Sequence, residues 1–214
     1  MQHDRAVCGA AHATIGNADH VGDALLQHFF RQRHVADFGE TIISSRYPAH
    51  TLVGEEEGGR IADAVSWVID PIDGTKSFVK RWIGVADRAS CNGEPCAVNA
   101  CMHLRDARLC STDPRMFTGE AERAFVRLAR EVRVTRFGTD CYGYAMLASG
   151  HVDIVIEDGL QVHDVMAIVP VIHGAGGIIT TWSGGPIDET FEGNIIAAAT
   201  QSLHDEASRW LGQP

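Results

Sequence analysis

Acidic residues at the ends of β-type segments have the clearest chemical use in this sequence. Asp70 and Asp73 stand in the turn Asp-Pro-Ile-Asp-Gly-Thr, which follows one apolar run. Glu55 and Glu56 follow a second run, and Asp164 begins an apolar helical segment. Carboxylate oxygens are the ligands that hard cations such as Mg²⁺ prefer, and such cations keep coordination positions open for phosphate. The combination indicates a magnesium site that binds a phosphate compound.

The turn after Asp70 also suits an anion. Gly74 lets the chain turn sharply, and the backbone amides of Gly74 and Thr75 can point at a phosphate from the start of a helix. Each acidic segment alone is as typical of an ordinary turn or a solvated charged face as it is of a metal site. The functional interpretation therefore depends on the segments occurring together.

The spacing of the acidic residues separates two phosphatase mechanisms. Haloacid-dehalogenase-like phosphatases use Asp-x-Asp, in which the first Asp is a covalent nucleophile. Asp70 and Asp73 are three positions apart, so we expect direct attack by water and no phosphoenzyme. The 11 histidines include no cluster typical of transition-metal ligation.

Composition limits the partners. The chain has 214 residues, a formal net charge of −10, 45% hydrophobic and 21% charged residues, which are values of a globular protein. Surfaces for nucleic acid or anionic membranes need clustered Lys and Arg. We therefore expect a small-molecule partner, no nucleic acid and no membrane.

Compartment signals are consistent with a cytoplasmic protein. The first residues lack the apolar segment of a signal peptide. The longest apolar stretch, Val165 to Ile172, is far shorter than the ~20 residues of a membrane span. The 6 cysteines are scattered without a Cys-x-x-Cys pair, which favours free buried thiols.

The elements that must position these groups follow from hydrophobic periodicity and turn residues. We expect an α/β fold of layered α+β type: a helical and antiparallel-sheet lobe over residues 1–115 and a mixed-sheet lobe over 116–214, with the site between them. Helices are predicted over 10–34, from a Thr118 N-cap, over 140–150, over 164–173, and from a capping-box-like Ser202 to Gly212. Strands are predicted near 50–53, 64–69, 132–137, 152–157, 177–181 and 194–200.

Three ordered motifs resemble a known family. The run from Trp67 to Phe78, WVIDPIDGTKSF, resembles the signature of the inositol monophosphatase-like, metal-dependent phosphatases, whose fold is sugar-phosphatase-like. His163-Asp164-Val-Met-Ala before Gly174-Ala-Gly-Gly resembles the second signature, and Gly54-Glu55-Glu56 stands upstream at the expected place. Thr-Lys-Ser-Phe and the segments that begin at 92, 108, 140, 152 and 167 resemble the histidinol-phosphate phosphatase branch. The resemblance covers about residues 45–200.

The resemblance implies a set of metal ligands for two or more Mg²⁺ ions. They are the side chains of Glu55, Asp70, Asp73 and Asp164 and the carbonyl of Ile72. The carboxylates of such a cluster would repel one another and take up protons unless cations neutralised them.

The resemblance also implies the other roles in the site. Thr75 would help to activate the attacking water, with a weaker assignment of Asp37 to the same task, and Glu56 would be an outer neighbour of the metals. The Gly74 and Thr75 amides would hold phosphate. Asp140 and Glu157 would lie near the alcohol part of the substrate, where their charge suits an amine such as that of histidinol.

The expected activity is Mg²⁺-dependent hydrolysis of a small phosphate monoester, foremost histidinol phosphate, which would place the protein in histidine biosynthesis. Two alternatives stay open: an inositol-1-phosphate phosphatase, and a degenerate relative that binds metal without turnover. A homodimer is also expected, because relatives are often dimers.

The degenerate alternative arises from a gap in the resemblance. From Val79 the chain runs directly to Lys80-Arg81-Trp82, where the family has two further core strands. Roughly 20–30 residues are missing. A trimmed first sheet would leave exposed ladder edges, which favour association.

Overall fold

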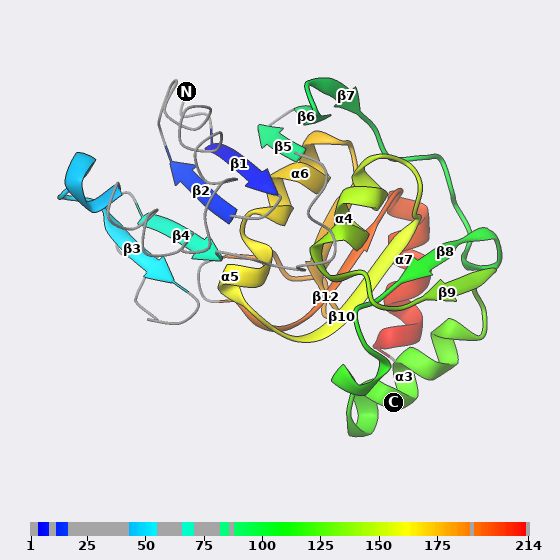
Figure 1. The fold of residues 1–214 in the computed structure, drawn as a ribbon. Helices are drawn as coiled ribbons and strands as arrows, with labels where there is room; N and C mark the ends of the chain where they lie inside the picture. The colour runs from blue at the N-terminus through cyan, green and yellow to red at the C-terminus, as the bar shows by residue number, and fades with distance from the viewer. Residues whose placement is uncertain are drawn as a thin grey trace.

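The computed structural model describes residues 4–8, 12–16, 43–54, 66–70, 82–85, 88–188 and 191–212. Two β-sheets lie on either side of a layer of helices, and further helices cover the far face of the second sheet (Figure 1). This layered arrangement of helices with sheets confirms the expected α/β class.

The first sheet has seven strands among the described residues, in the order β3-β4-β2-β1-β5-β6-β7. In chain order they are β1 (Asp4–Cys8), β2 (His12–Gly16), β3 (Thr51–Gly54), β4 (Ser66–Asp70), β5 (Trp82–Val85), β6 (Arg88–Cys91) and β7 (Glu94–Cys96). A helical turn over residues 43–46 precedes β3. The predicted strands near 50–53 and 64–69 are therefore confirmed as β3 and β4.

The N-terminal hairpin β1–β2 lies inside this sheet. Strand β2 pairs with β4, as in Ala13 opposite Ile69, and β1 pairs with β5, as in Val7 opposite Ile83. The predicted helix over 10–34 is thus wrong for residues 12–16, and the rest of that range lies outside the described residues. Because the hairpin supplies hydrogen-bond partners to β4 and β5, these two strands are not the bare ladder edges that the gap after Val79 suggested.

The second sheet is mixed, with the order β11-β12-β10-β8-β9. Strand β10 is parallel to β8 and antiparallel to β12, and β8 is parallel to β9. The strands are β8 (Arg108–Cys110), β9 (Val134–Arg136), β10 (Ile154–Gln161), β11 (Ile178–Thr181) and β12 (Glu192–Ala198). The change of sheet falls between β7 and β8, ahead of the predicted boundary at 115/116, and the division into two lobes stays a prediction.

The helices cover both faces of the second sheet. They are α3 (Gly119–Ala129), α4 (Asp140–Ala148), α5 (Val162–Val165), α6 (Ile168–Gly174) and α7 (Gln201–Leu211), with short 3₁₀ turns η1 (Leu104–Asp106) and η2 (Pro114–Met116). Along β10, Ile154 and Ile156 pack towards Leu128 of α3 and Leu203 of α7, whereas Val155 packs towards α4 and α6. This alternation is the period of two of a strand buried on both faces.

Helix α6 packs closely against the first sheet. An added Cβ on its last residue, Gly174, would lie 2.4 Å from the carbonyl oxygen of Arg88 in β6. Only glycine permits that approach of backbone to backbone. The helix thereby joins the two sheets, and its N-terminal neighbour α5 is held between them.

Two predicted helix boundaries are corrected. The helix predicted over 164–173 is divided into α5 and α6, because Pro170 has no N–H to donate to the carbonyl of Met166. The last helix is capped by Thr200, whose hydroxyl accepts a hydrogen bond from the Leu203 amide, and not by Ser202. Thr118 does occupy the N-cap position of α3, and Gly212 ends α7 as predicted.

Candidate active site

Three acidic residues that the sequence singled out line one cavity. Asp140 comes from the start of α4, Glu157 from β10, and Asp164 from α5. The cavity measures about 180 Å³. Its other lining residues are Thr112, Met116, Cys141, Tyr144, Leu160 and Ile168. The lining thus combines acidic groups with apolar and aromatic surface, a composition typical of small-molecule sites.

Asp164 is held by the start of its own helix. Its Oδ2 accepts a hydrogen bond of 2.7 Å from the Gln161 amide, as part of a capping box. Its Oδ1 lies 3.7 Å from Nε2 of His163, and the Asp164 side chain is 31% exposed. The carboxylate is therefore oriented while remaining accessible to a cation, and His163 lies beside it.

The first sheet brings the end of β4 towards the helix that carries Asp164. Strands β3 and β4 are parallel, with Gly54 opposite Ile69, so both strands end at the same edge of the sheet. Cα atoms of α5 lie within 8 Å of those of β4, and the arrowhead of β4 points towards α5 (Figure 1). The chain thus leaves β4 at Asp70 on the side of α5, and it leaves β3 at Gly54 beside the end of β4.

Most of the residues predicted to bind metal or phosphate, to orient the water or to neighbour the metals lie outside the described residues. These are Asp37, Glu55, Glu56, Ile72, Asp73, Gly74 and Thr75. Only the backbone of Asp70, the last residue of β4, is described. Within the described part of the chain, no three His, Cys, Asp or Glu side chains come together as a metal site. The partly exposed carboxylate of Asp164 fits a hard cation, which prefers oxygen ligands.

Glu157 is buried and hydrogen-bonded on both oxygens. The residue is 2% exposed. Oε1 accepts from the amide and the hydroxyl of Thr112, at 3.0 and 2.5 Å, and Oε2 accepts from the Tyr144 hydroxyl at 2.6 Å. Thr112 and Tyr144 are not among the site residues predicted from the sequence. Tyr144 could have been found, since it lies one helical turn after Asp140 and hence on the same face.

Asp140 has an unusual backbone conformation. Its φ of 44° lies in the left-handed region, at the first residue of α4. Asp adopts this region more readily than most residues, yet the conformation still costs about 1 kcal/mol or more and tends to occur at functional sites. Its charge is favourable beside the positive end of the helix.

A buried ion pair fixes the register of the strands that carry Thr112 and Glu157. Asp153, 2% exposed, precedes β10 and binds Arg108 at the start of β8, with 2.7 Å between Oδ2 and Nε. Its carboxylate also accepts from the Arg108 amide and from the side chain of Asn99. Because β8 and β10 are parallel, aligning their starts places Thr112, two residues after the end of β8, beside Glu157 in the middle of β10.

The surroundings of Asp153 shift its protonation. Burial alone would raise the pKa of its carboxyl, but hydrogen bonds from the Arg108 side chain and amide and from Asn99 lower that pKa below its ordinary value. The ionised form therefore predominates in the folded protein at neutral pH.

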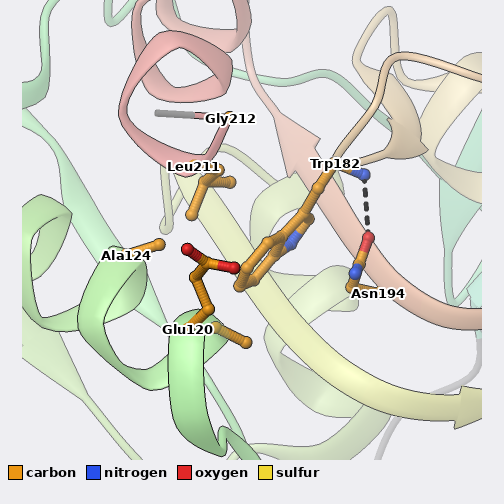
Figure 2. Close-up of a pocket in the computed structure, with 7 residues that line it drawn as sticks. Glu120, Ala124, Trp182, Asn194, Leu211 and Gly212 are labelled. Atoms are coloured by element: carbon orange, nitrogen blue, oxygen red, sulfur yellow. Dashed lines mark hydrogen bonds between the residues drawn. The ribbon is translucent and has the colours of Figure 1, made fainter. Parts of the chain in front are cut away.

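A second, larger cavity of about 300 Å³ lies between α3, α7 and the end of β11 (Figure 2). Trp182 stands at its centre, where its amide donates to Oδ1 of Asn194 at 3.1 Å and its indole donates to the Ile195 carbonyl. Among the described residues that line it, Glu120 carries the one carboxylate. Since none of the described residues that line this cavity belongs to the predicted site, the Asp164 cavity is the candidate active site.

Comparison with known proteins gives the family. The family model described as "Inositol monophosphatase family" matches residues 31–88 and 85–211. This chain belongs to the inositol monophosphatase family. It is therefore a phosphatase, from a family that depends in general on metal ions. Among the described residues, no helix is both long enough and apolar enough to cross a membrane.

Several relatives of this inositol monophosphatase family member carry informative names. The bifunctional phosphatase IMPL2, chloroplastic, of Arabidopsis thaliana is 35% identical, over 91% of this chain and 73% of the relative. A histidinol-phosphatase of Streptomyces coelicolor is 28% identical, over 80% of this chain and 78% of its own. An inositol monophosphatase structure from Zymomonas mobilis superposes with a TM-score of 0.77 at 29% identity, covering 89% of this chain and 92% of that one.

The comparisons also support a shortened family member. The two segments that match the family meet at residues 85–88, a few residues after the gap inferred at Val79. The alignment with the Arabidopsis phosphatase extends over 256 positions, more than the 214 residues of this chain. The relative therefore has residues that this chain lacks.

Proposed function

We propose that this chain hydrolyses a small phosphate monoester with Mg²⁺, and that its preferred substrate is histidinol phosphate. The observation that carries the proposal is that Asp140, Glu157 and Asp164 line the same cavity. An acidic cavity repels a phosphate ester unless cations are bound in it, and carboxylates that hold no metal favour a substrate whose alcohol part is cationic. Histidinol provides such a cation through its amine.

In this proposal the metal ions are held by Asp164 from one side and by the residues that follow β3 and β4 from the other. The proposed ligands are the side chains of Glu55, Asp70, Asp73 and Asp164 and the carbonyl of Ile72. Bound Mg²⁺ would lower the pKa of a water molecule and stabilise the leaving alkoxide.

The protein groups around the metals have separate tasks. Thr75, with Asp37, orients the attacking water, and Glu56 supports the metal ligands from outside. The amides of Gly74 and Thr75 bind phosphate oxygens. Asp140 and Glu157 bind the amine of the alcohol part, which leaves as histidinol after direct attack by water.

Two other activities are supported by particular observations. Inositol 1-phosphate is favoured by relatives such as human inositol monophosphatase 2, which is 30% identical over 75% of this chain. A degenerate protein that binds metal without turnover is favoured by the residues that the chain lacks.

We propose the cytoplasm as the compartment and a homodimer as the assembly. A partner of nucleic acid or anionic membrane is disfavoured by the net charge of −10.

Steady-state phosphate release tests the proposed substrate. With Mg²⁺, we expect kcat/KM for histidinol phosphate to exceed that for inositol 1-phosphate by about tenfold or more, the value of one charge-assisted hydrogen bond. EDTA should abolish release from both. A preference for inositol 1-phosphate would overturn the substrate, and no release by folded protein would favour the degenerate relative.

A further inference from the structure

We infer that Tyr144 and Thr112 are positioning residues, which hold the Glu157 carboxylate in the orientation that selects a cationic substrate. The inference rests on the proposed function and assigns its specificity to two side chains that do not themselves bind the amine. It follows from how Glu157 is held.

Glu157 is a buried acid whose hydrogen bonds come from two separate elements. Oε1 accepts both donors of Thr112, from the loop after β8, and Oε2 accepts the hydroxyl of Tyr144, from α4. Each carboxylate oxygen is thus bound from a different direction, which fixes the plane of the group. Buried carboxylates require such partners, because desolvation is otherwise costly.

Tyr144 is itself rigidly placed. Its residue is 1% exposed and belongs to the core cluster of α4, α6 and the second sheet. Its ring and the side chain of Asp140 both line the cavity, from consecutive turns of α4. Tyr144 therefore couples the orientation of Glu157 to the helix that carries the second proposed amine-binding carboxylate.

Thr112 is placed by the strand before it. Strand β8 is aligned with β10 by the Arg108–Asp153 ion pair, so the Thr112 amide arrives opposite Glu157. The amide bond to Oε1 survives any side-chain substitution at Thr112. Replacing Tyr144 by Phe removes the hydroxyl that donates to Oε2 and leaves no backbone donor in its place, so it is the sharper test of orientation.

This positioning role can be measured by comparing how much kcat/KM falls for a cationic and for a neutral phosphate ester. A fixed carboxylate makes a strong charge-assisted bond to an amine, whereas a neutral polyol gains less from the same charge. Loss of the Tyr144 hydroxyl should hence weaken binding of histidinol phosphate more than binding of glycerol 2-phosphate, whose alcohol part carries no charge. A purely structural defect would weaken both to the same extent.

The experiment compares Tyr144→Phe with the wild-type chain on these two substrates, with saturating Mg²⁺. We expect kcat/KM for histidinol phosphate to fall about tenfold more than that for glycerol 2-phosphate, chiefly through KM, as for loss of one hydrogen bond to a charged group. Tyr142→Phe is the matched control, because Tyr142 lies on the same helix but does not line the cavity. It should leave the ratio of the two kcat/KM values unchanged.

Thr112→Val provides a second route if Tyr144→Phe fails to fold, since it removes the hydroxyl that donates to Oε1 and nearly keeps the side-chain volume. It should shift the ratio in the same direction. If kcat/KM fell by the same factor for both substrates, or did not fall for either, this inference would be overturned while the proposed substrate would stand. A wild-type chain without any preference for histidinol phosphate would overturn the proposed substrate and this inference together.

Discussion

Asp164→Asn is expected to lower kcat/KM for phosphate release by about a thousandfold or more while the protein stays folded. A metal ion contributes several kcal/mol of transition-state stabilisation, and each 1.36 kcal/mol corresponds to a factor of ten in rate. The substituted amide is a poorer metal ligand than a carboxylate. Its carbonyl oxygen can still accept the hydrogen bond from the Gln161 amide that caps α5. Phosphate release should therefore fall, while the circular dichroism spectrum should stay that of the wild-type chain.

The matched control for this variant is Asp205→Asn. Asp205 lies on α7, is 59% exposed, and does not line the Asp164 cavity. The control removes the same charge from the chain and should leave kcat/KM within about twofold, as is usual for surface changes. Near-normal activity of Asp164→Asn would show that Asp164 is not a metal ligand. Equal losses in both variants would point to a general effect of charge.

Asp153→Asn is expected to lower the free energy of unfolding by about 3 kcal/mol at pH 7, the lower part of the range for breaking a buried ion pair. The lower part applies because the Arg108 side chain is 34% exposed and stays partly solvated. Because the pKa of Asp153 lies below its ordinary value, the stabilisation is complete above that ordinary value. This stabilisation is lost as the pH falls through the pKa that the Asp153 carboxyl has in the folded protein. Urea denaturation should therefore show the two proteins converging in acid.

Asp113→Asn is the control for that measurement. It makes the same substitution in another Asp–Arg pair, in which Arg115 is 88% exposed. Exposed pairs contribute little to stability, so the unfolding midpoint should hardly change. If Asp153→Asn were as mild as Asp113→Asn, the buried pair would not determine the alignment of β8 with β10.

The parts of the site that could be predicted from the sequence are those marked by local motifs. Asp140, Glu157 and Asp164 were selected through motif resemblance, and they line one cavity. Strands β3 and β4 were found because apolar runs end in turn residues. Thr112 and Tyr144 were missed because their contacts with Glu157 span 45 and 13 residues, and no local pattern reports such tertiary pairing.

The errors have physical causes as well. The helical spacing from Ile15 onward ignored the pairing that β4 and β5 offer to an inserted hairpin, and residues 12–16 form β2 instead. Sheet contacts override local propensity in such cases. The division of the helix at Met166 was readable from Pro170, which lacks the required donor. The cap of α7 moved to Thr200 because its hydroxyl reaches the Leu203 amide.

The central claim is that Asp164 and the acidic residues after β3 and β4 hold the same metal ions. Mn²⁺ binding, followed by the loss of the free-ion electron paramagnetic resonance signal, tests it most directly for the wild-type chain, Asp164→Asn, Asp73→Asn and Asp205→Asn. We predict that Asp164→Asn and Asp73→Asn each weaken Mn²⁺ binding by about tenfold or more, and that Asp205→Asn does not. Wild-type affinity in either of the first two variants, or no binding by the folded wild-type chain, would contradict a shared site.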